Sequence, residues 1–227
     1  LSFSLGKYDC MMVTFREDVE YARAKLGGEA ELLPLPPERY FLSLNSPSLQ
    51  MRTYLRGLVD PARLLGSAVK ATGEMIGAVA AERPPRTWED EVPKPPEEGT
   101  DVRVVYRKGD PVSARIAQKL LAEVSQDGAR CELAGLGGKE YERAMVDRSY
   151  SIAIGWVGQT VLSDRSEQLR MATIWFDDRS DEDELIRQVW EVPLFTVRRH
   201  VLARAGVAFY NDTMSGVYVR TEGTDEE

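Results

Sequence analysis

A strand–helix–strand pattern in the middle of the chain constrains the fold more than any other feature. Residues 101–108 (DVRVVYRK) are rich in β-branched side chains, as buried strands are. Asp110 and Pro111 suit the N-cap and the first position of a helix, and apolar residues recur along 110–128 at helical spacing. A second strand-like stretch follows at 129–136. This order predicts a crossover between parallel strands, and therefore an α/β fold.

Further helices and strands are predicted on both sides of this unit. Asp60 suits an N-cap, and the alternation of Tyr40, Leu42 and Leu44 is typical of a half-buried strand. Residues 82–101 hold five prolines and little apolar periodicity, which indicates a linker or a surface excursion. Helices are expected at 14–28, 51–58, 60–74, 139–147 and 181–190, and strands at 38–45, 150–156 and 192–203.

The composition is that of a globular protein that does not bind nucleic acid. The 227 residues are 43% hydrophobic and 29% charged, which is enough for one generous core or for two lobes. The net charge of −8 disfavours binding to phosphates, which needs a concentrated basic face. Arg198 and Arg199 form the densest basic spot, and we interpret them as a solvated face rather than an anion site.

Cysteine usage and hydropathy add two further expectations. Cys10 and Cys131 are too few for a disulfide framework or a zinc site, so two separate buried thiols are favoured, and one disulfide stays open if the protein is exported. No apolar stretch approaches the ~20 residues that a membrane-spanning helix needs. The opening residues carry no initiator methionine and no cleavage site, which suggests a piece of a longer gene product.

No catalytic or metal-binding constellation stands out, so the sequence predicts neither an enzyme nor a cofactor. His200 is the single histidine and is expected to be structural, since no triad or second imidazole accompanies it. Residues 135–141 (GLGGKEY) lack the spacing of a phosphate-binding loop and are interpreted as a strand-to-helix turn. Residues 177–184 (DDRSDEDE) lack the glycine of a calcium loop and are interpreted as a solvated helix start.

The end of the strand at 150–156 is the candidate binding position. In α/β sheets, ligands gather at the carboxyl ends of strands, and Trp156 lies at such an end. A tryptophan there can also be part of the core. Gly155 and Gly158 on either side of it would allow something to approach the backbone closely.

Several segments together resemble the extracytoplasmic solute-binding proteins of the oligopeptide, dipeptide and nickel type, also called family 5, which serve ABC importers. The resembling phrases occur in the family's order and span Leu5 to Asn211. They are LGKYDCMMV at 5–13, a crossing strand and two helices at 38–65, the strand–helix–strand unit at 102–133, YSIAIGWVG at 150–158, and the returning strand at 191–211.

The resemblance implies a periplasmic-binding-protein-like lobe with a mixed, partly parallel sheet flanked by helices. By this comparison, residues 1–40 are the remnant of the first lobe and 41–205 form the second, C-terminal lobe, with the proline-rich excursion at 82–101. Residues 206–227 are then a return segment and an acidic tail.

The resemblance also implies the site and the partners. Trp156, Gly158 and Gln159 would line an interlobe cleft, with Asn45 near the hinge. Peptide-binding members carry an aspartate at the position of Gln159, where it meets the ammonium group of the peptide; an amide cannot neutralise that charge. The implied ligand is a small, peptide-like or other solute, and the implied partners are the membrane subunits of an importer.

Three functions therefore remain to be distinguished. The preferred one is the solute-binding component of an importer, in fragment form and located in the periplasm or otherwise outside the cytoplasm. The first alternative is a ligand-sensing domain of a cytoplasmic transcriptional regulator, fused to DNA-binding helices outside this segment. The second is an interaction scaffold that has lost ligand binding.

Overall fold

A computed structural model describes residues 10–26, 30–69, 75–81, 97–126, 128–158, 188–204, 207–212 and 216–221. In this part of the chain one mixed sheet has the strand order β1-β7-β2-β6-β4-β5, with β3 paired to β7. Its strands are β1 (Cys10–Val13), β2 (Ala30–Leu44), β3 (Val79–Ala80), β4 (Asp101–Arg107), β5 (Arg130–Leu136), β6 (Ile152–Gly158) and β7 (Glu191–Arg204). The helices are α1 (Arg16–Leu26), α2 (Leu49–Gly57), α3 (Pro61–Arg63), the π-helical turn η2 (Leu64–Val69), α4 (Pro111–Ser125) and α5 (Gly138–Val146).

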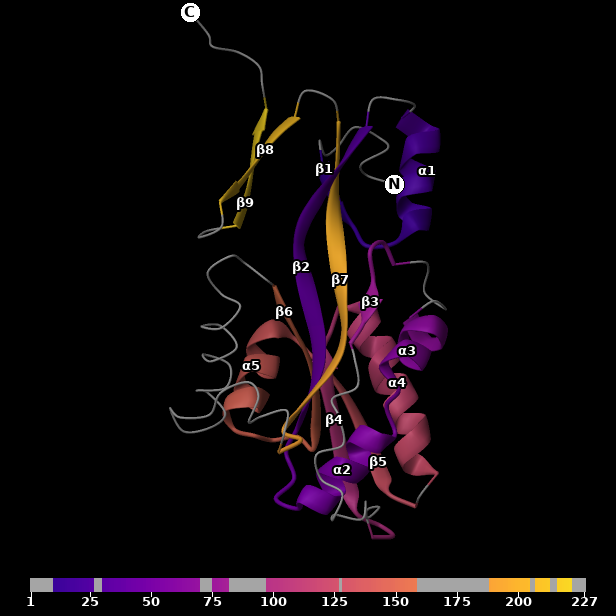
Figure 1. Ribbon diagram of the computed structural model, residues 1–227. Helices are drawn as coiled ribbons and strands as arrows, with labels where there is room; N and C mark the ends of the chain where they lie inside the picture. The colour runs from indigo at the N-terminus through magenta and orange to yellow at the C-terminus, as the bar shows by residue number, and fades with distance from the viewer. Residues whose placement is uncertain are drawn as a thin grey trace, which may run out of the picture.

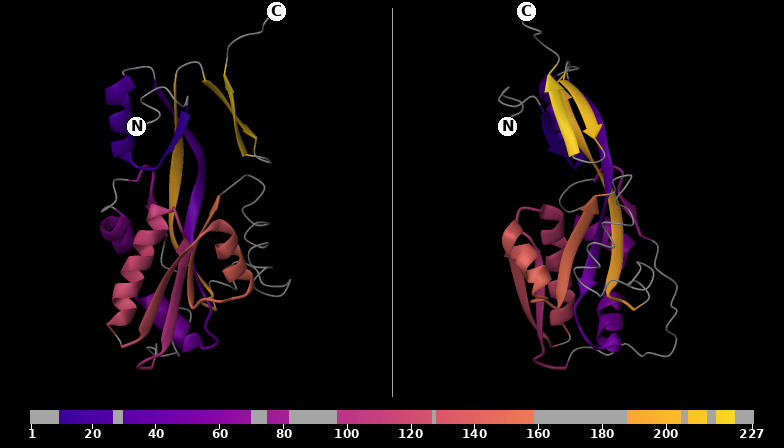
Figure 2. Two further views of the ribbon diagram at one scale, coloured as in Figure 1. Left: turned by 180° about the vertical axis from the view of Figure 1, so that it is seen from behind. Right: turned by 90° about the vertical axis from the view of Figure 1, so that its left-hand side faces the viewer.

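Two long antiparallel strands, β2 and β7, run through the molecule and connect its two ends (Figure 1). At one end they lie beside β1 and α1, and the hairpin of β8 (Val207–Asp212) and β9 (Gly216–Thr221) is near the same end. At the other end they enter a body formed by β4, β5, β6 and the helices α2 to α5, which Figure 2 shows from two further sides. The predicted α/β class, with a mixed and partly parallel sheet flanked by helices, is confirmed.

The predicted strand–helix–strand unit is present as β4, α4 and β5. Strand β4 pairs in parallel with both β5 and β6, so the carboxyl ends of these three strands meet at one edge of the sheet. The apolar stripe of α4 is buried against this sheet; it comprises Val112, Ile116, Leu120 and Val124. Asp110 caps α4 as predicted, because its carboxylate accepts the backbone N–H of Val112.

The segment 60–74 departs from its prediction as one continuous helix. Asp60 caps the backbone N–H of Arg63 as expected, but the α-helical part ends at Arg63 and passes into η2. The turn predicted at 135–141 is confirmed: Gly137 is the N-cap of α5, and the carboxylate of Glu140 accepts the backbone N–H of Gly137 at 3.0 Å.

Strand β2 is longer than the predicted strand at 38–45 and begins at Ala30. Only its second half, from Glu38, pairs with both β6 and β7; the first half pairs with β7 alone. A proline lacks the N–H donor that a central strand needs, so Pro34 and Pro37 are tolerated where one side of the strand has no ladder partner. The register shifts between these two prolines, so two residues of β2 lie opposite the single Arg199 of β7.

The remaining features compare with the sequence analysis as follows. Cys10 and Cys131 are free thiols, each partly buried. The hairpin β8–β9 was not predicted within 206–227. The predicted helix at 181–190 and the excursion at 82–101 fall mostly on residues that the structure does not describe. No helix in the described part of the chain is long and apolar enough to cross a membrane.

Candidate functional site

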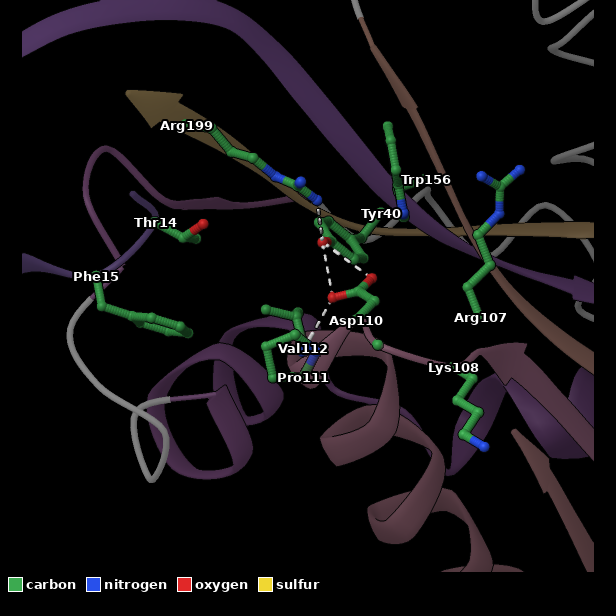
Figure 3. A pocket seen from close by; sticks show the side chains of 11 residues that line it. Thr14, Phe15, Tyr40, Arg107, Lys108, Asp110, Pro111, Val112, Trp156 and Arg199 are labelled. Atoms are coloured by element: carbon green, nitrogen blue, oxygen red, sulfur yellow. Dashed lines mark hydrogen bonds between the residues drawn. The ribbon is translucent and has the colours of Figure 1, made fainter. Parts of the chain in front are cut away.

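A pocket of about 270 Å³ lies where the carboxyl edge of β4 and β6 meets β2, β7 and the start of α1 (Figure 3). The residues that line it come from five segments that are far apart in the sequence. They are Thr14, Phe15, Tyr40, Arg107, Lys108, Gly109, Asp110, Pro111, Val112, Trp156 and Arg199.

The sheet register places Tyr40 and Trp156 on the same face. The two residues are direct partners across the antiparallel pair of β2 and β6, and directly opposed residues share a face. Tyr40 is also opposite Phe195 of β7, and the two rings pack with centroids 5.1 Å apart. Tyr40 is 1% exposed, so the aromatic floor of the pocket is continuous with the hydrophobic core.

Asp110 is held in place by several donors. One carboxylate oxygen accepts the N–H of Val112 at 3.1 Å, and the other accepts the hydroxyl of Ser113 at 2.6 Å. The hydroxyl of Tyr40 donates to the nearer oxygen of Asp110 at 3.2 Å. Burial, reinforced by the charge of Asp110, raises the pKa of Tyr40 against the opposing effect of Arg199, so its hydroxyl stays protonated and can donate.

Arg199 and Glu38 form a largely buried ion pair behind this group. The Nε atom of Arg199 lies 2.8 Å from Oε2 of Glu38, and the two side chains are 17% and 13% exposed. Arg199 also donates from Nη2 to the hydroxyl of Tyr40 at 3.3 Å. Burial raises the pKa of Glu38, although Arg199 lowers it in part. The prediction that Arg198 and Arg199 form a solvated face is correct for Arg198, which is exposed, and wrong for Arg199.

Strand alternation explains why Arg199 points inward. Residues two apart on a strand share a face, and Phe195, Val197 and Arg199 follow one another at this spacing. Phe195 and Val197 are fully buried, so Arg199 continues the inward row at the point where the row reaches the pocket. Its neighbours Arg198 and His200 lie on the other face; His200 is buried next to β1 and β2 and does not line the pocket.

Trp156 lies between two guanidinium groups. Cζ of Arg199 is 4.8 Å from the ring centroid and Cζ of Arg107 is 5.6 Å from it, on either side of the indole in Figure 3. Such cation–π contacts fix the orientation of the ring. The indole Nε1 is buried and has no hydrogen-bond partner among the described residues, although it is a donor.

The structure brings only part of the predicted site to this pocket. Trp156 lines it, and Gly158 ends the same strand opposite Glu38. Asn45 lies at the far end of β2, where its amide donates to the carbonyls of Arg148 and Tyr150, and it does not line the pocket. Gln159 lies outside the described residues.

Gly155 has a role that differs from the close approach expected of it. A Cβ at this position would lie 2.5 Å from Cζ of Phe41, its partner on β2. Phe41 is buried and alternates with Tyr40, so its ring lies on the opposite face of the sheet from the pocket. The glycine therefore admits a core ring rather than a ligand.

Four pocket groups were not predicted from the sequence: Tyr40 and Arg199 as lining residues, Arg107 beside the indole, and Asp110 as more than a helix cap. Two signals could have found them. Residues 107–110 lie at and just after the carboxyl end of β4, which is parallel to the strand β6 that contains Trp156, and Arg199 has the alternation described above. Among the described residues, no three His, Cys, Asp or Glu side chains gather as a metal site would require.

The fold is that of known solute-binding proteins. A dipeptide-binding protein from Pseudoalteromonas in complex with Met-Leu matches 97% of this chain with a TM-score of 0.66 and 11% identity. The oligopeptide-binding protein AppA from Bacillus subtilis, in complex with a nonapeptide, matches 93% with a TM-score of 0.65 and 11% identity. NikA from Brucella suis, in complex with Fe(III)-EDTA, matches 93% with a TM-score of 0.58 and 15% identity.

These likenesses confirm, for the fold, the family resemblance found in the sequence. The chain has the fold of a portion of the solute-binding proteins of family 5, and it covers 55%, 55% and 56% of the three solved chains, about half of each. Two of these three proteins are named as binding proteins, one for dipeptides and one for oligopeptides. No protein-family model and no curated protein matches the sequence.

Proposed function

We propose that this chain is the second-lobe portion of a solute-binding component of an ABC importer, and that it binds a small solute in the pocket that Trp156 lines. The observation that carries the proposal is the pocket itself. An indole with an unpartnered buried donor lines a hollow at the carboxyl edge of parallel strands, where α/β proteins place their ligands. The described lining residues include no serine, cysteine or histidine, so binding is proposed rather than catalysis.

The division of the chain follows from the same proposal. Residues 41–205 would form the second lobe, and residues 1–40 would belong to the first lobe, which β2 and β7 connect to the second. Closure of the two lobes around a solute would then bend these strands, and the closed form would be recognised by the importer's membrane subunits. The solute-binding component of an importer captures its solute outside the cytoplasmic membrane, so an extracytoplasmic location is part of the proposal.

The replacement at Gln159 makes ordinary peptides poor ligands. A peptide ammonium needs a charge partner when it is buried, and loss of one charge-assisted hydrogen bond costs about 1.5–3 kcal/mol, or roughly one to two decades in affinity. We expect di- to pentapeptides with free amino termini to bind more weakly than micromolar.

Isothermal titration against a library of peptides, amino acids, carboxylates and metal chelates tests the proposal. We expect at least one solute to bind, with an affinity that Trp156→Ala lowers and Trp190→Phe does not. Trp190 is a suitable control because its ring stacks on Arg52, whose guanidinium carbon lies 3.6 Å from its centroid, and it does not line the pocket. Absence of binding across the library would favour the interaction scaffold, and a submicromolar affinity for free peptides would contradict the role given to Gln159.

A further inference from the structure

The net charge around the pocket is opposite in sign to the net charge of the whole chain. Three cationic residues line it, Arg107, Lys108 and Arg199, and Asp110 is the one carboxylate among the described lining residues. Glu38 adds a second carboxylate behind Arg199. The three cations outnumber the two carboxylates in a protein whose net charge is −8. A local excess of positive charge attracts anions and disfavours an entering ammonium group.

The single lining carboxylate is not available as a strong anchor. Asp110 already accepts hydrogen bonds from the N–H of Val112 and from the hydroxyls of Ser113 and Tyr40. A carboxylate has about four acceptor positions, so little capacity is left for a ligand ammonium. Because Asp110 is the N-cap of α4, the positive end of the helix dipole also offsets its charge.

The hydrogen-bond donors of the pocket, in contrast, are in excess. Arg107 is partly buried and has no carboxylate partner in the described part of the chain. Its guanidinium contacts the rings of Tyr141 and Trp156. Arg199 uses Nε towards Glu38 and one N–H of Nη2 towards Tyr40, which leaves donors on the same guanidinium. The Nε1 donor of Trp156 between them is buried and unpartnered. A buried donor without an acceptor costs about 1–3 kcal/mol, which an acceptor on the ligand would recover.

We propose that the solute is an oxyanion, most simply a carboxylate, and that Arg199 and Arg107, which flank Trp156, are its cationic anchors. This inference rests on the proposed function. A carboxylate is planar and rich in acceptors, so it matches a guanidinium in geometry and charge, and it can also accept from the indole. Glu38 is then a positioning residue, because its ion pair holds Arg199 against the indole rather than letting it extend to solvent.

The test uses ligands of similar size that differ mainly in charge. Four trialanine peptides serve: acetylated at the amino end (anionic), amidated at the carboxyl end (cationic), blocked at both ends (neutral) and free at both ends (zwitterionic). Succinate and putrescine form a second pair without peptide bonds. Isothermal titration should rank the acetylated peptide above its amidated and blocked counterparts, and succinate above putrescine.

Two arginine variants locate the anchor. Arg199→Gln and Arg107→Gln should each weaken the anionic ligands about 10- to 100-fold, as expected for loss of a charge-assisted hydrogen bond, and should weaken the blocked peptide much less. Arg107→Gln breaks no ion pair within the described residues, so it separates loss of binding from loss of folding. Arg103→Gln is the matched control, since Arg103 is on the same strand but pairs with Glu132 and does not line the pocket.

The outcomes separate the two proposals. If ligands bind in a manner that depends on Trp156 but the cationic or blocked members bind as well as the anionic ones, the oxyanion proposal is wrong and the solute-binding proposal stands. The same conclusion follows if both arginine variants bind anions normally. If no member of the set and no solute of the wider library binds, both proposals are wrong.

Discussion

Replacement of Gly155 by alanine should destabilise the protein through Phe41. The added Cβ would lie 2.5 Å from Cζ and 2.9 Å from Cε2 of the Phe41 ring, whereas carbon atoms in contact are normally about 3.5–4.0 Å apart. The ring would have to withdraw by about 1 Å. It is only 5% exposed, so it has little free space into which to move. Overpacking of this kind costs about 1–3 kcal/mol.

A smaller effect acts in the opposite direction. Alanine restricts the unfolded chain more than glycine does, which stabilises by about 0.4–1 kcal/mol where the backbone conformation suits it. Gly155 is not among the glycines with positive φ, so this gain applies. The net expectation is a loss of about 1–2 kcal/mol, which corresponds to roughly 2–8 °C in Tm for a chain of this size.

Urea unfolding of four variants measures this effect: Gly155→Ala, Gly57→Ala, Phe41→Leu and the double variant Gly155→Ala/Phe41→Leu. Gly57→Ala is the matched control: Gly57 is the last residue of α2, and no atom lies within 4 Å of its added Cβ. We expect it to keep or raise stability. Phe41→Leu should cost less in the Gly155→Ala background than in the wild type, because the smaller side chain makes room for the methyl group. Equal stability of Gly155→Ala and Gly57→Ala would refute the reasoning.

Three further perturbations follow from the described contacts. Asp110→Ala should lower the free energy of unfolding by about 2–4 kcal/mol, because α4 loses its cap and the buried hydroxyl of Ser113 loses its acceptor. Asp110→Asn should lower the free energy of unfolding by less, and urea titration of both variants checks this. His200→Gln tests pH dependence, because burial lowers the pKa of His200 and the folded state therefore binds fewer protons than the unfolded state. The free energy of unfolding of the wild type, relative to that of the variant, should fall as pH drops below about 6.5. A constant difference between pH 8 and 5 would contradict this. Arg52→Lys should destabilise by about 1–3 kcal/mol, since the guanidinium of Arg52 donates to the carbonyls of Ser46 and Gln188 while it stacks on Trp190, and an ammonium cannot do all of these; the thermal midpoint and the fluorescence of Trp190 should both change.

The local elements could be predicted because their signals are local. The caps at Asp60 and Asp110 and the apolar spacing of α4 depend on residues within one or two turns of the chain. The first half of β2 could not be predicted in the same way. Its prolines argue against a central strand, which needs hydrogen-bond partners on both sides. They are compatible with β2 only because β6, more than 100 residues away in the sequence, does not pair with this half of the strand.

Of the residues that line the pocket, the sequence indicated only Trp156, which lies near the end of a strand. Trp156 could be found because a single buried strand runs into it. The groups around it come from four other segments, and only the pairing of β2 with β6 and β7 brings Tyr40 and Arg199 together. Asn45 shows the converse: it follows a strand that contributes Tyr40 to the pocket, but it is five residues beyond Tyr40 and lies outside the pocket.

The most direct test of solute binding is the indole N–H signal of Trp156 in a ¹⁵N-correlated NMR spectrum, assigned by its loss in Trp156→Phe. Of the four tryptophans, we expect this signal to move most, and saturably, when a solute binds, because Nε1 gains an acceptor. A solute that binds by calorimetry but leaves the Trp156 signal in place would contradict the assignment of this pocket as the binding site.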